Sequence, residues 1–493
     1  MKQLKQTQSV CPECLKVLDA SIHEQDGKVY IDKTCPEHGY FKDLYWGDYD
    51  QYVRAEKYEY PGTKLSNPRT TKLRGCPYDC GICTEHKSHT VLAIIDVTNR
   101  CNLSCPICFA HAGAAGYIYE PTREQVHNML VNLRSNHPVK PPGLQFSGGE
   151  PTVREDLPEL VGMAKELGFE HVEVNSNGLR MSESLDYCRT LKQAGVSTVY
   201  LQFDGVTEEP YLAARGRPLL EIKKKALQNL RAGGFKSVVL VPTVVRGVND
   251  HQIGDIIRFA LDNRDVIRCV NFQPVSITGR IDKQKRESMR ITIPDLMLLV
   301  EDQTAGLLKR KDWYPVPTVV PLAQFVGKLK DRKYVEFSTS PHCGMATYLV
   351  DEGGRLAPIT EYIDIDGFLR AIGRASEFAE KGHKTRAKLS IARSAVSKID
   401  LGMLRKYILP VIRTGTYDSL RDLHMRMIMI GSMHFMDPYN FDLQRVNRCL
   451  IHYATPDGKL IPFCTMNTLH RAGVEEKFKV SFEDYAKRRT EEA

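Results

Sequence analysis

Between residues 91 and 275 the chain alternates short apolar segments with amphipathic helical patterns. Six segments have the length and composition of buried strands: residues 91–97, 144–146, 171–174, 198–203, 237–245 and 267–272. The helical patterns lie between them, at residues 123–134, 157–167, 184–194, 219–232 and 252–263. Strands that alternate with helices form parallel sheets with right-handed crossovers. The alternation therefore predicts an α/β fold, a partial (β/α)6 barrel, with its site at the C-terminal ends of the strands.

The rest of the 493-residue chain is expected to form smaller units around this barrel. We predict a small metal-binding unit at residues 1–60, a cysteine-containing connection at 61–90, the barrel at 91–290 and a helical region with further cysteines at 291–493. Helical patterns in the last region include residues 384–398 and 418–433. No apolar run approaches the roughly 18–20 residues that span a bilayer, and the polar N-terminus lacks a signal-peptide core. We therefore expect a cytoplasmic protein.

Most of the 14 cysteines fall in tight groups, which in a cytosolic chain indicates metal ligands rather than disulfides. The first group is Cys11, Cys14, Cys35 and His38, two knuckles separated by 20 residues. Four such ligands suit a closed tetrahedral site. We expect zinc there, with a rubredoxin-like iron as the alternative. Its role would be structural, because 60 residues hold little core without a metal.

Cys101, Cys105 and Cys108 have the spacing C-x3-C-x2-C directly after the first predicted strand. Three thiolates on one loop can each bind one iron of a [4Fe–4S] cluster, which leaves the fourth iron open to a small molecule. A structural zinc knuckle is the alternative. The segment SGGEP, residues 147–151, ends the second predicted strand. Its two glycines allow close approach of backbone to a ligand, and its carboxylate can accept an ammonium group.

These two segments, CNLSCPIC and SGGEP, resemble the radical S-adenosylmethionine (SAM) superfamily. The resemblance implies that Cys101, Cys105 and Cys108 hold the cluster and that SAM binds its open iron. It also implies that residues 148–150 bind the methionine amino group. The candidates for SAM contacts are Phe109, Gly148, Gly149, Glu150, Asn175, Ser176, Asn177, Gln202, Asp204, Val245 and Gln273.

A second triad has the same spacing but precedes the barrel, and we interpret it as an auxiliary [4Fe–4S] cluster: Cys76, Cys80 and Cys83. A zinc site is the alternative, and the fourth ligand could be His86, His89 or Cys269. Three more cysteines in glycine-rich, turn-like sequence resemble the C-terminal auxiliary-cluster regions of radical SAM enzymes: Cys343, Cys449 and Cys464. Three unrelated core cysteines are the alternative. In total we expect about three [4Fe–4S] clusters, SAM and one mononuclear zinc or iron ion.

The order of the motifs (CPEC, CPEHG, RGCPYDCGICTEHKSHT, the SAM triad, YLQFDG and VVRGVND) resembles the archaeal tetraether lipid synthase group over nearly the whole chain. That resemblance implies C–C bond formation between terminal methyl carbons of phytanyl chains. The implied partners are an archaeal diether phospholipid, a low-potential electron donor of the ferredoxin or flavodoxin type, and the membrane surface. Residues 370–426 hold 13 Lys/Arg against 5 Asp/Glu, and residues 425–436 are rich in methionine. Basic amphipathic helices suit anionic headgroups.

Three other functions are compatible with parts of this pattern. A radical SAM enzyme of cofactor or peptide modification also uses auxiliary clusters. An electron-transfer protein is a second alternative, but it needs neither an open iron nor an amino-acid pocket. A nucleic-acid-binding module is the third. The chain lacks a basic stripe with interleaved aromatic residues, so we expect no nucleic-acid partner.

Overall fold

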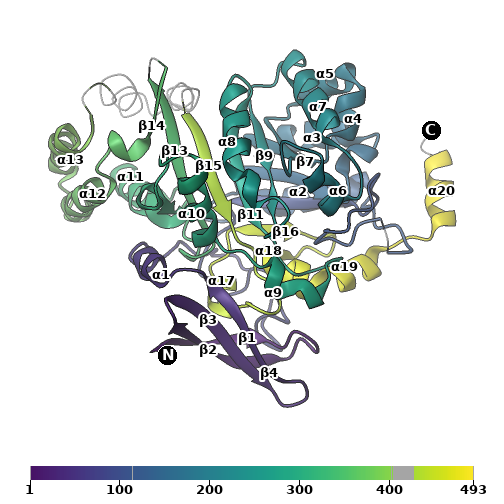
Figure 1. Cartoon of the computed structure of the whole chain (residues 1–493), viewed down its shortest axis with the longest axis horizontal. Coiled ribbons are helices and arrows are strands. Elements are labelled where there is room, and N and C mark those ends of the chain that lie inside the picture. The colour runs from purple at the N-terminus through teal and green to yellow at the C-terminus, as the bar shows by residue number, and fades with distance from the viewer. Residues whose placement is uncertain (1, 114, 353, 401, 403–426, 492–493) are drawn as a thin grey trace.

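The computed structural model describes residues 2–113, 115–352, 354–400, 402 and 427–491. These residues form two sheets, one of 4 strands at the N-terminus and one of 13 strands. The small sheet lies below the large one as a separate layer, and the C-terminal helix α20 (Phe482–Glu491) stands apart from the main body at the right of the view (Figure 1). The predicted α/β class is confirmed.

The N-terminal sheet is an antiparallel meander of four strands. They are β1 (Lys2–Val10), β2 (Val17–Gln25), β3 (Lys28–Cys35) and β4 (Gly39–Trp46). Asp26 and Gly27 join β2 to β3 with φ of 52° and 73°, because a two-residue hairpin of this hand needs positive φ at both positions. The β1–β2 and β3–β4 connections carry the two predicted metal-binding knuckles. Helix α1 (Tyr49–Glu56) follows and leads away from the sheet.

The predicted barrel strands are all present and lie parallel in the large sheet. Their order is β11, β9, β8, β7, β6, β5. The strands are β5 (Leu92–Thr98), β6 (Gly143–Gly148), β7 (His171–Ser176), β8 (Thr198–Gln202), β9 (Val238–Val241) and β11 (Ile267–Pro274). The crossover helices are α2 (Arg123–Arg134), α3 (Leu157–Glu166), α5 (Leu185–Ala194), α7 (Leu220–Ala232) and α8 (Ile253–Asp262).

Helix α2 shows why these segments form helices. Thr122 accepts a hydrogen bond from the backbone of Gln125 and the Gln125 side chain accepts one in return, a capping box that satisfies the first turn. Apolar side chains follow at helical spacing, and Val126, Leu130 and Leu133 are fully buried. Each such burial stabilises the fold by about 1.5–3 kcal/mol as an upper estimate. The helix is therefore held against the sheet by one apolar face.

The C-terminal third adds strands to both edges of the barrel sheet. Strand β15 (Met427–Met433) lies parallel to β11 and antiparallel to β13 (Gly344–Glu352), and β16 (Ile451–Ala454) lies parallel to β5. We expected a helix over residues 418–433. Residues 427–433 instead form β15, while residues 418–426 lie outside the described part. A strand buried between two others reads as a continuous apolar run, which periodicity does not separate from a buried helix.

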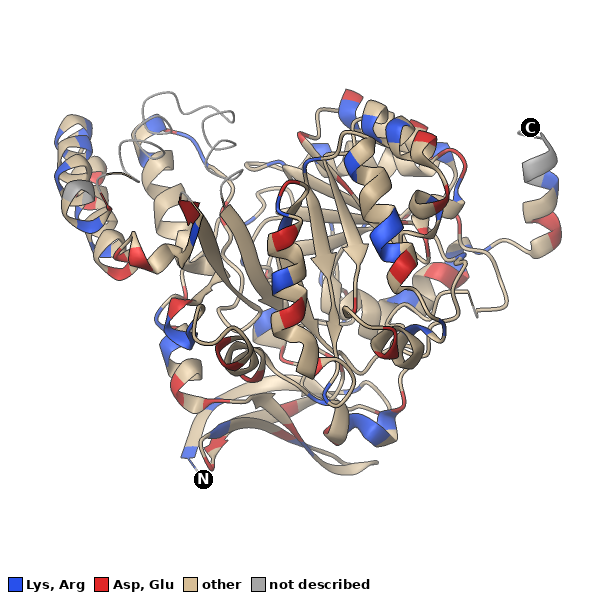
Figure 2. Ribbon diagram, turned by 45° about the horizontal axis from the view of Figure 1, so that its top comes forward, with Lys and Arg blue, Asp and Glu red and all other residues tan. Residues whose placement is uncertain are grey.

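Helices α12 (Ile365–Glu380) and α13 (Lys384–Lys398) pack together in the C-terminal region. Helix α13 was predicted from the sequence, whereas α12 was not. Lys and Arg side chains are frequent on this pair, and charged residues of both signs cover the other outer helices (Figure 2). Among the helices of the described residues, none is both long enough and apolar enough to cross a membrane.

Candidate active site

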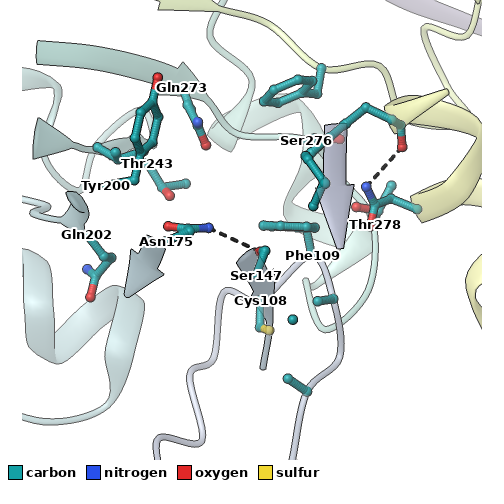
Figure 3. Close-up of a pocket in the computed structure, with 18 of the residues that line it drawn as sticks. Cys108, Phe109, Ser147, Asn175, Tyr200, Gln202, Thr243, Gln273, Ser276 and Thr278 are labelled. Carbon is teal, nitrogen blue, oxygen red and sulfur yellow. Dashed lines mark hydrogen bonds between the residues drawn. The ribbon is translucent and has the colours of Figure 1, made fainter. Parts of the chain in front are cut away.

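A cavity lies at the C-terminal ends of the barrel strands. Its wall combines the loop after β5, the ends of β6, β7, β8 and β11, and two C-terminal segments near residues 433–436 and 463–467. Figure 3 shows polar side chains of β7, β8 and β11 facing the same space as Cys108 and Phe109. The cavity therefore lies where the sequence predicts the site.

The loop after β5 brings Cys101, Cys105 and Cys108 to this cavity. Arg280 fixes the loop: its guanidinium donates to the Cys105 carbonyl at 3.1 Å and its backbone N–H donates to the Cys108 carbonyl at 2.8 Å. Burial raises the pKa of the Cys101 thiol to about 12 and raises that of Cys105 as well. Thiols in such a site ionise when a metal binds. A cluster spreads its ligands more widely than one ion does, and the three sulfur atoms do not converge on a single point. The triad fits a [4Fe–4S] cluster.

The SGGEP turn packs directly on the beginning of this loop. Gly149 donates to the Thr98 carbonyl at 2.7 Å, and Glu150 donates to the Arg100 carbonyl at 2.8 Å. A Cβ on Gly148 would lie 2.2 Å from the Thr98 oxygen, and a Cβ on Gly149 would lie 2.2 Å from the Arg100 oxygen. The two glycines are therefore required for the turn to approach the cysteine loop. The sequence alone did not show that this loop is the neighbour of the glycines.

The Glu150 carboxylate is fully buried at the end of β6. Its Oε1 accepts hydrogen bonds from Thr152 Oγ1 at 2.6 Å and Ser176 Oγ at 2.8 Å, and its Oε2 accepts one from the Asn177 N–H at 2.7 Å. A carboxylate offers about four acceptor sites, so Oε2 retains capacity for one more donor. Burial raises the pKa of Glu150. The arrangement ties β6 to β7 and leaves room for an ammonium group.

The other predicted SAM contacts divide into two groups. Those that line the cavity are Phe109, Asn175, Ser176, Asn177, Gln202 and Gln273. Asp204 and Val245 do not reach its surface. Asp204 is fully buried in an ion pair, and Val245 packs in an apolar cluster with Val275 and Ile277 while its backbone bonds within its own turn.

Arg215 is a cavity residue that the sequence analysis missed. It ends helix α6 (Glu209–Arg215) and binds both Asp204 oxygens, at 2.7 and 2.8 Å. A third bond, 2.9 Å long, runs to the Ile107 carbonyl in the cysteine loop. A buried guanidinium beside Cys105 provides positive charge next to ligands that become anionic. The unmatched carboxylate at the end of β8 was the signal that could have pointed to it.

The C-terminal cysteines converge although they are far apart in sequence. Cys449 and Cys464 pack in one apolar cluster with Cys76 and Cys80, and the Arg445 guanidinium donates to Cys343 Sγ at 3.4 Å. Burial raises the pKa of Cys464, and the neighbouring Cys449 contributes to the rise. Cys464 lines the cavity itself. Cys464 therefore lies beside the same space as Cys101, Cys105 and Cys108.

The structure gives other contacts for the three expected fourth ligands of the Cys76 triad. His86 Nε2 bonds the Cys449 carbonyl at 2.9 Å, and both His89 ring nitrogens bond backbone atoms, at 3.1 and 3.2 Å. Cys269 lies on β11 among apolar barrel residues. Outside the triad, the cysteines that share the apolar cluster of Cys76 and Cys80 are Cys449 and Cys464.

The two N-terminal knuckles meet in one tight group. The ligand atoms of Cys11, Cys14, Cys35 and His38 all lie within 4.8 Å of one another. Cys14 and Cys35 sulfur atoms are 3.9 Å apart, and Cys11 Sγ is 3.7 Å from His38 Nδ1. With metal–sulfur bonds of about 2.3 Å, tetrahedral ligands lie roughly 3.8 Å apart. The group fits a single metal ion.

Comparisons with known proteins agree with this geometry. Residues 95–260 match the radical SAM superfamily, and residues 3–47 match the HMPTM N-terminal zinc ribbon domain. The chain is 52% identical, over 98% of its length and 97% of the relative, to 7,8-dihydro-6-hydroxymethylpterin dimethyltransferase of Methanocaldococcus jannaschii. It is 29% identical to a probable GTP 3',8-cyclase of Methanothermobacter marburgensis over 38% of this chain and 58% of that one. Among solved structures, Streptococcus suis SuiB matches 45% of this chain and 47% of its own, with 19% identity and a TM-score of 0.37.

The full-length relative contradicts the predicted lipid reaction. Its name describes methylation of a pterin, so the prediction of a tetraether lipid synthase acting on a diether phospholipid at the membrane is wrong. The motif order was the basis of that prediction, and it describes metal and SAM ligands rather than a substrate. The methionines that suggested a lipid surface include Met433 and Met436, which line the cavity inside the fold.

The matches to the radical SAM superfamily and to the zinc ribbon domain indicate which cofactors the chain binds. The chain uses a [4Fe–4S] cluster with SAM, and its ribbon binds a mononuclear metal ion. The similarity to the dimethyltransferase covers 98% of the chain and is therefore not confined to the barrel. The chain belongs to the radical SAM superfamily and, within it, to the family of 7,8-dihydro-6-hydroxymethylpterin dimethyltransferase.

Proposed function

We propose that this protein is a radical SAM methyltransferase that modifies a pterin of the 7,8-dihydro-6-hydroxymethylpterin type. The observation that carries the proposal is the 52% identity to the pterin dimethyltransferase over 98% of the chain. It corresponds to the cofactor-modifying alternative rather than to a lipid substrate.

The cavity residues have distinct roles in this proposal. Cys101, Cys105 and Cys108 hold the SAM cluster, and the SGGEP turn with Glu150 receives the methionine amino group. Asn175, Ser176, Asn177, Gln202 and Gln273 supply hydrogen bonds around SAM, and Asp204 acts through Arg215 rather than by direct contact. When bound, the cluster and SAM supply one-electron chemistry, which reaches carbon atoms whose hydrogens no side-chain base can remove.

A group of aromatic side chains lines the cavity and favours a flat substrate. The Phe435 and Phe463 rings are stacked with centroids 3.9 Å apart, and Phe109 lies 5.8 Å from Phe463. All three side chains line the cavity. Stacked or tilted aromatic contacts of this kind stabilise a planar ring by about 0.5–1.5 kcal/mol each. A pterin ring has the shape that such a wall accommodates.

The auxiliary cysteines support a second role for iron near the substrate. Cys464 follows Phe463 directly and lines the cavity, so a cluster held there would lie beside the bound ring. We propose auxiliary [4Fe–4S] clusters at the Cys76 triad and at Cys343, Cys449 and Cys464, which bring the total to about three. A low-potential ferredoxin or flavodoxin would reduce them.

The deciding experiment uses the anaerobic, iron-reconstituted protein with SAM, a low-potential reductant and 7,8-dihydro-6-hydroxymethylpterin. Mass spectrometry should detect the pterin with added methyl groups, and the product should be absent when SAM is omitted. SAM labelled in its methyl group tests whether the new carbon comes from SAM. A fully reconstituted enzyme that cleaves SAM but never alters the pterin would refute the proposal.

A further inference from the structure

Two polar side chains inside the barrel lie one layer deeper than the residues assigned to SAM. These residues are Asn271 on β11 and Tyr200 on β8. Because side chains alternate along a strand, Asn271 faces the same side of its strand as Gln273. Tyr200 likewise faces the same side of its strand as Gln202. Both line the cavity. The ring of Tyr200 packs against an apolar group that includes Cys269 and Val239.

Neither side chain has a hydrogen-bond partner among the described residues. Asn271 is 5% exposed, and its side-chain amide makes no hydrogen bond to another described residue. The Tyr200 hydroxyl is likewise unpaired within the described chain. Gln145 occupies the neighbouring inner face of β6 but is already bonded to Glu173 at 2.9 Å. Asn271 and Tyr200 both line the cavity, so their polar atoms are available to a bound ligand, whereas the side chain of Gln145 is already paired.

The volume beside Asn271 and the protonation state of the Tyr200 hydroxyl both favour a ligand at this position. Asn271 pairs across the sheet with Gly431, which has no side chain to fill the adjacent volume; a Cβ there would lie 3.6 Å from Asn271 Oδ1. Burial raises the pKa of Tyr200, so its hydroxyl stays protonated and can donate. In Figure 3 the Tyr200 side chain stands beside Gln273 at the cavity.

We propose that Asn271 and Tyr200 form the subsite that recognises the hydrogen-bonding edge of the substrate ring. The inference rests on the proposed function and identifies which residues determine specificity. An amide offers one donor face and one acceptor in a plane, as in the bidentate pairing of Asn with adenine. The pyrimidinone edge of a pterin presents donors and acceptors side by side. The aromatic wall of Phe109, Phe435 and Phe463 would hold the ring face.

The test measures binding of two fluorescent probes, 6-hydroxymethylpterin and 6-hydroxymethyllumazine, to the reconstituted protein with SAM. The probes have the same shape but differ at the edge, where an amino group is replaced by a carbonyl. We expect the wild type to bind the pterin about ten-fold more tightly than the lumazine. Asn271→Leu should abolish this preference, and Tyr200→Phe, which retains the ring, should weaken pterin binding two- to ten-fold.

Val241→Ala is the matched control, because Val241 lines the same cavity from β9 without a hydrogen-bonding group. It should keep the preference for the pterin. Circular dichroism and iron content verify that each variant is folded. If Asn271→Leu and Tyr200→Phe both retain the wild-type preference, the subsite is overturned while the proposed function stands. If the wild type binds neither probe and does not methylate the dihydropterin, the proposed function fails with it.

Discussion

At the scale of single residues, the cysteines after β5 provide the most direct test of the site. Cys101→Ala, Cys105→Ala and Cys108→Ala should each abolish 5'-deoxyadenosine formation, because a cluster that loses one of three ligands is not retained. The matched control is Cys188→Ala, a buried thiol on α5 that contacts the Met181 carbonyl. Chromatography of the reaction mixture measures the product. Persistent SAM cleavage in any of the three variants would show that another triad binds SAM.

Gly149→Ala probes the contact between the SGGEP turn and the cysteine loop. Its Cβ would meet the Arg100 oxygen at 2.2 Å, which forces the backbone apart and costs about 1–3 kcal/mol. We expect a lower denaturation midpoint and the loss of SAM cleavage. Gly162→Ala on α3 is the matched control: its Cβ meets nothing within 4 Å, so it should stabilise the protein by about 0.5–1 kcal/mol. If Gly149→Ala and Gly162→Ala had the same stability and the same SAM cleavage, the contact between Gly149 and the Arg100 oxygen would not be the reason for a glycine at this position.

At the scale of elements, His342 joins the ribbon to the large sheet. Its ring stacks on Tyr52 of α1 at 4.1 Å, and its Nε2 lies 3.2 Å from the Tyr52 carbonyl. Burial lowers the pKa of His342 to about 3, whereas the unfolded chain binds a proton near pH 6.5. The unfolded state therefore binds more protons between pH 6.5 and 3, and stability is lost as pH falls through this window.

We expect one such histidine to reduce the free energy of unfolding by about 2 kcal/mol between pH 7 and pH 5. His342→Phe keeps the stacked ring but cannot titrate, so its stability should depend less on pH. Urea unfolding at the two pH values measures the difference. His127→Phe, on the exposed face of α2, should behave as the wild type does. An unchanged pH slope in His342→Phe would rule out this histidine as the acid-sensitive contact.

At the scale of the whole molecule, the metal content tests the proposed ligand groups together. Anaerobically reconstituted protein should hold about three [4Fe–4S] clusters and one mononuclear ion. Cys35→Ser should remove the mononuclear ion and leave the clusters, because its sulfur lies in the separate ribbon group. Elemental analysis and Mössbauer spectroscopy measure both. A wild-type sample with only four irons would eliminate the auxiliary clusters.

The sequence predicted the parts whose signal is local. The six strands and the helices between them were found because apolar periodicity and caps are contained in short segments, and the ribbon ligands because of their spacing. Strand β15 was mistaken for a helix because its apolar run is buried on both faces. Arg215 was not identified because the sequence shows a carboxylate, Asp204, at the end of β8 but not which cation lies beside it. Asn271 was not identified because nothing in the sequence shows that its amide lacks a partner among the described residues. The predicted lipid substrate was wrong because the order of the motifs reflects the ligands of the metals and of SAM rather than the substrate.

The place of β16 beside β5 has a consequence for how the protein is made. The first barrel strand receives a neighbour that is synthesised about 350 residues later, and Cys449 and Cys464 arrive with the same segment. A ribosome-bound chain that has completed the barrel strands therefore still has an open edge and no complete auxiliary ligand set. The chain can close its sheet and enclose its iron only after the C-terminal strand has been released, so a truncated copy would expose its cysteine loop rather than act as a smaller enzyme.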